Sequence, residues 1–239
     1  PKLMIMVDCG STSNEAIDYL NNKNIKSIII DHHEINNPYP KSNTIINPKK
    51  NINYSLKNYF CATTLTYFFL EIIVKKTKSS FNLSNYLIYV LLALVCDVMP
   101  LRKINRSIAL NLIKNFNIKD NFVFKTLYEL SEKKINLTID DLGFFIGPII
   151  NSGGRLSNSL IAANLLISNN LPFIKNQSKK LIKLNNKRRE VEDKILSKID
   201  FELIEKENKD VIIYYKPNIK EGLIGIIASR LKDYFNKPS

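Results

Sequence analysis

The sequence predicts an α/β protein, in which a parallel-sheet domain is joined by a long helix to the start of a second, smaller α/β domain. Three observations predict this class. β-Branched runs alternate with helical patterns in the first 50 residues, a long helix-period stretch begins near residue 177, and a further apolar run begins at residue 211. We expect a first domain over 1–172, a connecting helix over 173–207 and a second domain over 208–239.

The composition is that of a globular, basic protein. Hydrophobic residues make up 45% of the 239 residues, which excludes a disordered chain. The net charge of +13 favours a polyanionic partner such as nucleic acid, although a chain rich in Lys, Asn and Ile can also reflect an AT-rich genome. The three cysteines are scattered without a C-x-x-C pair, which fits a reducing, cytoplasmic location. The longest apolar run, 86–96, is shorter than the roughly 20 residues that cross a bilayer, so we expect no membrane partner.

The chain begins with a strand-helix-strand pattern. An apolar strand is expected over 3–7, a helix over 13–22 after the capping-box pair Thr12 and Glu15, and a second strand over 25–30. Such a unit should be right-handed with parallel strands. A short third strand is expected over 44–46, within a proline-containing connection.

Polar side chains follow both of the first two strands. Asp8 ends the first strand, and Asp31, His32 and His33 end the second. Ligands of open parallel sheets bind at the carboxyl ends of the strands, and buried polar groups of this kind need a compensating partner such as a metal ion. Histidines that only cap a strand are the alternative. We favour a metal-phosphate site.

The remainder of the chain reads mainly as helical. The apolar periodicity predicts one further strand and several helices. The helices are expected over 61–74, 85–96 with Ser84 as cap, 104–115, 123–130, 177–207 and 223–235, and the strand over 210–215.

Asp97 follows an apolar helix and opposes the helix dipole there. It could simply end the helix. A compensating cation is the interpretation that we favour.

Two further features suggest contacts with phosphate. The run 147–155 is glycine-rich and ends in Arg155, which predicts either a phosphate-binding backbone with an arginine fork or a tight loop with a solvated arginine. Ser229 and Arg230 lie in the last helix, behind Gly222. The many lysines of the long helix favour a solvated face over a dedicated DNA-binding face.

These residues resemble a known family. The segments DCG (8–10), DHH (31–33) and VCDVMPL (95–101) are similar to successive metal motifs of the DHH phosphoesterase superfamily. GPIINSGGRL (147–156) and GLIGIIASRL (222–231) resemble two signatures of the RecJ family of single-strand-specific 5′ to 3′ DNA exonucleases. The likeness runs along essentially the whole chain in the expected order.

The resemblance implies a phosphodiesterase with two divalent metal ions, usually Mn²⁺ and otherwise Mg²⁺, acting on single-stranded DNA in recombination and repair. A single-strand-binding protein or a helicase would be a possible partner. By matched motif positions, the metal ligands would be Asp8, His32 and Asp97, and the catalytic residues would be His33 and Asp31. The residues that hold the DNA backbone would be Asn151, Arg155, Ser229 and Arg230.

The sequence also departs from the family pattern. Its Asp-rich first motif and the oligonucleotide-binding domain are not in this sequence, so we expect an N-terminally incomplete first domain, a truncated second domain and little nuclease activity from residues 1–239 alone. Lys220 stands where the family usually has His, and Ile149 where it often has Arg. The run 61–64 lacks an expected glycine. Two rival functions follow: a DHH oligoribonuclease or cyclic-dinucleotide phosphodiesterase, and a non-catalytic DNA-binding relative.

Overall fold

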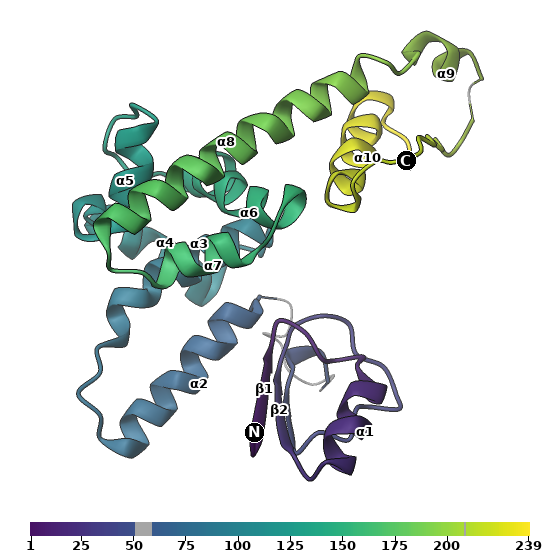
Figure 1. Cartoon of the computed structure of the whole chain (residues 1–239). Coiled ribbons are helices and arrows are strands. Elements are labelled where there is room, and N and C mark those ends of the chain that lie inside the picture. The colour runs from purple at the N-terminus through teal and green to yellow at the C-terminus, as the bar shows by residue number, and fades with distance from the viewer. Residues whose placement is uncertain (51–58, 208) are drawn as a thin grey trace. The chain divides into compact units, whose positions relative to one another are not determined.

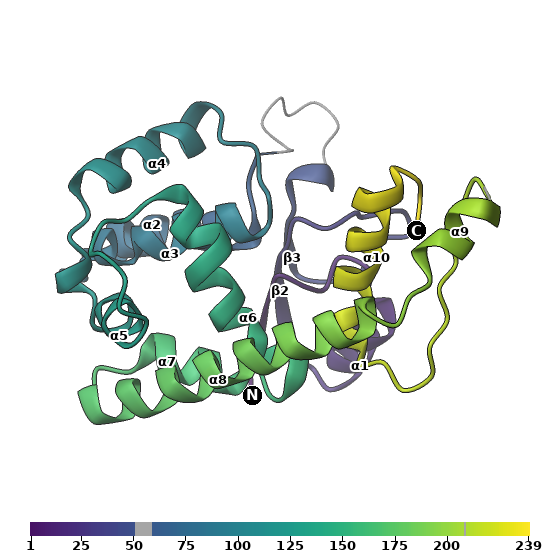
Figure 2. The same ribbon diagram turned by 90° about the horizontal axis from the view of Figure 1, so that it is seen from above.

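The computed structural model describes residues 1–50, 59–207 and 209–239, which form two compact units (Figures 1 and 2). The first unit contains Pro1–Phe116 and Leu137–Gly143. The second contains Asn117–Asn136 and Phe144–Ser239. The expected α/β class is confirmed: a small parallel sheet is accompanied by many helices.

The sheet of the first unit has three parallel strands in the order β1-β2-β3. They are β1 (Leu3–Val7), β2 (Lys26–Ile30) and β3 (Thr44–Ile46). Val7 pairs with Ile30, and Ile30 pairs with Ile46, so all three strands end at the same level.

Helix α1 (Asn14–Asn22) connects β1 to β2 (Figure 1). Its Ile17 and the β2 residues Ile29 and Ile30 are fully buried. The expected strand-helix-strand unit is therefore present. Its capping box is not, because Ser13 occupies the N-cap without a side-chain hydrogen bond.

The other elements of the first unit are helical. The longer ones are α2 (Ala62–Thr77), α3 (Leu87–Cys96) and α4 (Lys103–Asn115). Two short 3₁₀ turns, η1 (Pro48–Lys50) and η2 (Leu83–Tyr86), precede α2 and α3. Asn82, not Ser84, caps η2, because its Oδ1 accepts from the Ser84 amide at 3.0 Å. The buried residues of α3, among them Leu91 and Leu94, form the core between the helices.

All the regular secondary structure in the described part of the second unit is helical. Its elements, in chain order, are η3 (Ile118–Asp120), α5 (Phe122–Leu130), α6 (Gly147–Leu156), α7 (Leu160–Ile167), α8 (Leu171–Leu196), α9 (Phe201–Glu207) and α10 (Glu221–Phe235). A π-helical turn, η4 (Asp141–Ile146), leads into α6 and is preceded by the expected cap, in which the Asp141 amide donates to Thr138 Oγ1 at 3.1 Å. Helix α8 is the centre of the unit, since α5, α6, α7 and α10 all contact it.

The glycine-rich segment is a helix, α6, so the tight loop, one of the two alternatives for 147–155, does not form. Pro148 lies in the first turn of α6, where proline is well tolerated. The glycines serve helix packing. A Cβ on Gly153 would lie 3.1 Å from the Asn158 carbonyl oxygen and 3.2 Å from Leu181 Cδ2 of α8. Glycine at this position lets α6 approach α8 closely.

The strand expected over 210–215 does not form. A strand needs a hydrogen-bonded neighbour, and the described part of this unit offers none. The Ile212 amide donates instead to the Pro238 carbonyl at 2.8 Å, and the Ile212 side chain packs with Ile195 and Ile227. The predicted strand is therefore wrong: Ile212 anchors an irregular segment, and its neighbours Val211 and Ile213 are exposed.

The long helix expected over 177–207 is two helices. Helix α8 starts earlier, at Leu171, because Asn170 Oδ1 accepts from the Phe173 amide at 3.0 Å. It ends at Leu196, and the next helix begins where Asp200 Oδ1 accepts from the Leu203 amide at 2.9 Å. None of the described helices combines the length and apolarity that crossing a membrane requires.

Candidate metal centre

Three polar residues form a row at the carboxyl ends of the three strands. Asp8, Asp31 and Asn47 each follow the last residue of β1, β2 and β3, respectively. The Asp8 amide donates to the Ile30 carbonyl at 2.9 Å, and the Asp31 amide donates to the Ile46 carbonyl at 3.0 Å. These bonds continue the strand ladders by one residue, so the sheet itself fixes the positions of both carboxylates.

Asp31 is the centre of the hydrogen bonds at this edge. Its side chain is 1% exposed. Oδ1 accepts from the amides of His32 at 2.8 Å and His33 at 3.2 Å, and Oδ2 accepts from the Ser11 amide at 3.0 Å. Burial alone would raise the pKa of Asp31, but the hydrogen bonds from Ser11 and His33 outweigh it and hold that pKa well below its usual range. Asp31 is therefore an ionised carboxylate that organises the loop after β2.

Asp31 also orients the imidazole of His33. The His33 Nδ1 lies 2.7 Å from Asp31 Oδ1. An ionised carboxylate only accepts hydrogen bonds, so Nδ1 must carry the proton and Nε2 keeps the lone pair of the neutral ring. The hydrogen bond to Asp31 raises the pKa of His33. A carboxylate behind an imidazole in this way is the usual arrangement for a metal-binding or proton-transferring histidine.

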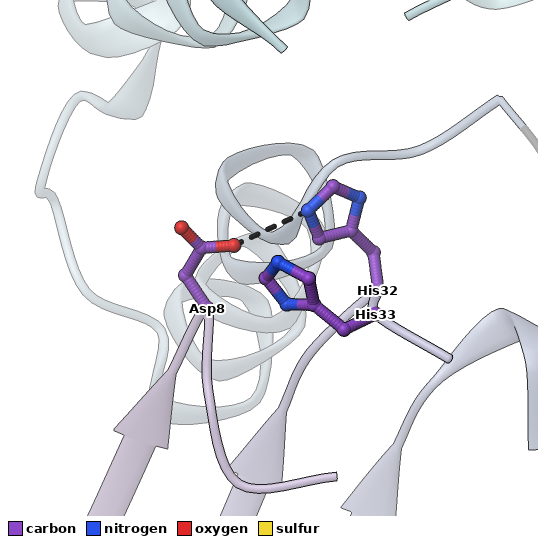
Figure 3. A group of neighbouring side chains, drawn as sticks. All are labelled: Asp8, His32 and His33. Atoms are coloured by element: carbon purple, nitrogen blue, oxygen red, sulfur yellow. Dashed lines mark ion pairs between the residues drawn. The ribbon is translucent and has the colours of Figure 1, made fainter. Parts of the chain in front are cut away.

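Asp8, His32 and His33 converge in front of the sheet (Figure 3). Each offers one ligand atom, and these atoms all lie within 4.8 Å of one another. His32 Nε2 is 3.3 Å from Asp8 Oδ1. The Asp8 and His33 side chains are 57% and 61% exposed, so a ligand can reach the group from solvent.

The backbone beside this group adopts unusual conformations. Asp8 has φ of 63°, and Gly10, which follows it closely, has φ of 110°. Val98, directly after Asp97, has φ of 53°, which is rare for a β-branched residue. Such conformations cost free energy and occur often at functional sites.

Asp97 lies near the three converging side chains without joining them at that spacing. Burial and the negative charge of Asp8 raise the pKa of Asp97, whereas His32 and His33 lower it. Its charge is thus within electrostatic reach of the group. The sequence placed Asp97 with Asp8 and His32 as ligands. The structure brings His33, rather than Asp97, into the set of ligand atoms within 4.8 Å.

The donor chemistry suits a hard or borderline divalent cation. A carboxylate and two imidazoles, with a further carboxylate near by, are ligands for Mn²⁺ or Mg²⁺, and the group contains no thiolate. The negative charge of Asp8 raises the pKa of Asp97, and a bound cation would relieve that repulsion. The residues present therefore fit a divalent metal ion.

The residues expected to hold DNA lie on α6 and α10 of the second unit. Asn151 and Ser229 are exposed, and neither makes a side-chain hydrogen bond within the part of the chain that the structure describes. Arg155 Nη1 donates to the Gly222 carbonyl at 2.8 Å. Arg230 Nε donates to Glu192 Oε1 at 3.0 Å, although 64% of the arginine side chain is exposed. Both arginines therefore have protein partners.

Glu192 is the centre of an arginine cluster, which consists of Glu192, Arg188, Arg230 and Arg155. The Glu192 side chain is 6% exposed, and its Oε2 also accepts from Arg188 Nη1 at 2.9 Å. Burial lowers the pKa of Arg188, Glu192 opposes that effect, and the positive charges of Arg155 and Arg230 add to it. One buried carboxylate thus faces several guanidinium groups, which leaves the cluster with a net positive charge.

Sequence reasoning missed four residues that organise these two places. Ser11 holds Asp31, and Asn47 donates to Ser11 Oγ at 2.7 Å and to the His33 carbonyl at 2.9 Å. Asn47 was available as a signal, because it follows the third strand as Asp8 and Asp31 follow the first two. Arg188 and Glu192 lie in a lysine-rich helix, where their i, i+4 spacing looked like an ordinary surface ion pair.

Comparison with known proteins supports the resemblance. Residues 1–94 match the model described as DHH family, N-terminal domain. The chain is 27% identical over 252 residues to the single-stranded-DNA-specific exonuclease RecJ of Haemophilus influenzae, covering 99% of this chain and 44% of the relative. It is also 27% identical over 254 residues to the RecJ of Escherichia coli, with the same coverage. The chain thus spans less than half the length of these relatives.

The fold is similar to solved RecJ structures. The structure of RecJ from Thermus thermophilus in complex with Mn²⁺ superposes with a TM-score of 0.84 at 21% identity, over 99% of this chain and 35% of that one. A second RecJ structure, bound to manganese, gives a TM-score of 0.83 at 20% identity and covers 59% of its chain. The expected recognition is confirmed as a likeness: the chain is similar to RecJ over nearly its whole length, and residues 1–94 match the DHH family model.

Proposed function

We propose that this chain is the catalytic part of a RecJ-type exonuclease, which hydrolyses single-stranded DNA from the 5′ end during recombination and repair. The observation that carries the proposal is the convergence of Asp8, His32 and His33 at the carboxyl ends of parallel strands, in a chain that is similar to RecJ over 99% of its length. The convergence supports metal-dependent hydrolysis, and the similarity to RecJ supports single-stranded DNA as the substrate.

Asp8, His32 and Asp97 would hold divalent metal ions, with Mn²⁺ as the first choice and Mg²⁺ as the second. Bound divalent ions would activate water and offset the charge that develops on the phosphodiester. The spacing of the ligand atoms supports Asp8 and His32, and the electrostatic interaction of Asp97 with both supports Asp97 as a further ligand. Two such ions are expected by analogy with the family.

His33 would act on the substrate, and Asp31 would act through His33. Asp31 holds the His33 ring through Nδ1, which directs Nε2 toward the side of Asp8 and His32. At Nε2 the ring would contact the scissile phosphate or move a proton. The buried position of Asp31 keeps it from meeting substrate, so it is a positioning residue for His33.

Asn151, Arg155, Ser229 and Arg230 would hold the DNA backbone. Asn151, Ser229 and Arg230 are exposed, and the net positive charge of the arginine cluster supports phosphate binding. A single-strand-binding protein or a helicase would supply the strand. The three free cysteines support a cytoplasmic location.

The test of the activity uses the complete gene product that carries this sequence. It is incubated with Mn²⁺ and with 5′- or 3′-labelled single-stranded DNA, duplex DNA and short RNA. The expected result is loss of nucleotides from the 5′ end of single-stranded DNA, which stops with EDTA. Preferential digestion of RNA would favour an oligoribonuclease. Binding without digestion would favour the non-catalytic relative, for which Ile149, buried at 3% exposure, is the supporting observation.

The test of the metal site uses residues 1–239 and the electron paramagnetic resonance of Mn²⁺. Asp8→Asn removes a ligand charge but suits the left-handed backbone at this position, so the fold should persist. We expect a fall in Mn²⁺ affinity of about 10-fold or more. Asp18→Asn, which changes an exposed carboxylate of α1, is the matched control. Equal Mn²⁺ affinity in all three proteins would overturn the assignment.

A further inference from the structure

A groove in the second unit collects lysines that none of the sites above uses. It lies between α8 and the segment 216–220 that precedes α10, and its volume is about 380 Å³. Five lysines line it, and we call it the lysine groove: Lys187, Lys194, Lys198, Lys216 and Lys220. No carboxylate is among its lining residues.

The floor of the lysine groove is apolar. Val191, Ile195 and Leu223 are among the side chains that line it, and Ile195 and Leu223 are 5% and 1% exposed. The lysines therefore border a packed apolar surface, and all of them except the half-buried Lys216 are exposed to solvent. Lys220 Nζ donates to the Leu156 carbonyl at 2.7 Å, which fixes one wall of the groove.

The lysines continue as a stripe along α8. At about 100° per residue, Lys179, Lys183, Lys187 and Lys194 fall within a sector of about 80° on the helix surface, and Lys198 follows just after the C-cap, Ser197. From Lys179 to Lys194 the stripe is about 22 Å long, at about 1.5 Å per residue. Lys179, Lys183 and Lys187 also line a second hollow, which Lys187 shares with the lysine groove.

These lysines are not used for structure. Within the described residues, none of the five lysines of the stripe forms an ion pair. Glu190 lies in the same sector of α8 and lines the second hollow, so it offsets part of the stripe's charge, whereas Glu192 is bonded to Arg188 and Arg230. The stripe therefore keeps most of its positive charge.

We propose that the lysine groove and its continuation along α8 bind the phosphate backbone of a single DNA strand, without reading its sequence. A row of ammonium groups about 6 Å apart at each i, i+4 step can follow consecutive phosphates of an extended strand. No aromatic side chain lines the groove, so the contact depends on charge and not on base stacking. The choice of DNA as the strand rests on the proposed function.

The experiment measures binding of fluorescein-labelled oligothymidylate of about 20 nucleotides to residues 1–239 by fluorescence anisotropy, in EDTA and over about 0.05–0.2 M salt. The groove variant carries Lys187→Gln, Lys194→Gln and Lys198→Gln. Losing three phosphate contacts should reduce the slope of log affinity against log salt by about 2, which corresponds to about 100-fold weaker binding near 0.1 M salt. Replacing the same three lysines by arginine should preserve binding.

The matched control removes the same charge from exposed lysines outside the groove: Lys76→Gln, Lys114→Gln and Lys119→Gln. It should bind within a few-fold of the parent chain. Equal losses in the control and groove variants, no binding by the parent chain, or tighter binding of duplex than of single-stranded DNA would each overturn the proposal. If the groove variant bound DNA normally while the complete protein cleaved DNA, the proposed role of the lysine groove would be wrong and the proposed function would stand. If DNA binding depended on the lysine groove but the complete protein cleaved no DNA, the proposed function would be wrong and the role of the groove would stand.

Discussion

The strand-end site of the first unit and the arginine cluster of the second were both expected to bind charged groups, but they are built differently. At the strand ends, Asp8 and Asp31 are positioned by backbone hydrogen bonds that continue the sheet. In the arginine cluster, Arg155 and Arg230 are positioned by side-chain contacts to residues 67 and 38 positions away along the chain. In the first arrangement, the partners are backbone atoms at the end of the neighbouring strand. The second depends on how distant helices pack.

This difference explains what each region presents to a ligand. The strand ends present ligand atoms of Asp8, His32 and His33 together, because Asp31 satisfies the surrounding amides. The arginine cluster presents guanidinium groups that already have partners in the protein, so a phosphate there would share or replace existing hydrogen bonds. Substitutions at the strand-end site and in the arginine cluster should therefore differ in their effect on stability. Three predictions follow from that contrast.

Asp31→Ala should cause the largest loss of stability. Without the carboxylate, the amides of Ser11, His32 and His33 lose their acceptor in a buried place. We expect the free energy of unfolding of the first unit to fall by about 3–5 kcal/mol. Hydrogen exchange of the β2 amides, measured by mass spectrometry, reports this unit separately from the rest of the chain.

The control for that prediction is Asp18→Ala, which removes an exposed carboxylate of α1. It should change the stability by no more than about 0.5 kcal/mol. Asp31→Asn should fall between the two, because an amide keeps one acceptor oxygen. If Asp31→Ala exchanged no faster than Asp18→Ala, the description of Asp31 as the organiser of the strand-end site would be wrong.

Substitution of Glu192 should cause the next largest loss of stability, and it tests the arginine cluster. Glu192→Gln removes the charge that compensates Arg188, whose side chain is only 12% exposed. We expect a loss of about 2 kcal/mol in the free energy of unfolding of the second unit. Urea unfolding followed by hydrogen exchange of α8 would measure it.

A double-mutant cycle then separates the two arginines. Pairing Glu192→Gln with Arg188→Met should give a larger coupling energy than pairing it with Arg230→Met, because Arg230 is 64% exposed and water screens its ion pair. A larger coupling for Arg230 would contradict the view that Arg188 is the buried partner and that Arg230 remains available at the surface.

Sequence reasoning predicted the strand-end site well because the relevant information is local. A strand ends at a given residue, successive parallel strands end at one edge, and polar residues just after them must therefore meet. Asp8, His32 and His33 followed from that rule. Asp97 did not follow as closely, since its position depends on how α3 packs beside the sheet, and periodicity along a helix carries no information about that packing.

The fold outside the sheet was predicted less completely, for similar reasons. Most helices were correctly predicted from apolar periodicity. No helix was predicted over 147–155, whereas Gly153 here allows helix α6 to approach Leu181 of α8. The apolar run 210–215 has strand composition but no neighbouring strand in the described residues. Both errors concern partners that lie far away in the sequence.

Gly222→Ala should have the smallest of the three losses, and Gly225 of the same helix provides its control. A Cβ on Gly222 would lie 2.7 Å from Arg155 Cα and 2.8 Å from the Arg155 carbonyl oxygen, and backbone atoms cannot move aside as a flexible side chain can. A Cβ on Gly225 would meet nothing within 4 Å. Neither glycine has a left-handed φ, so the difference between the two substitutions is steric.

We therefore expect Gly222→Ala to lower the free energy of unfolding of the second unit by about 1–2 kcal/mol, because α6 and α10 must separate slightly. Gly225→Ala should instead raise it by up to about 1 kcal/mol, through the better helix propensity of alanine. Hydrogen exchange of α6 and α10 compares the two variants directly. Opposite signs would mean that Gly222 is required for the packing that positions Arg155. Equal effects would mean that α10 tolerates a displaced contact, and that the arginine cluster does not depend on close packing in the way that the strand-end site depends on its sheet.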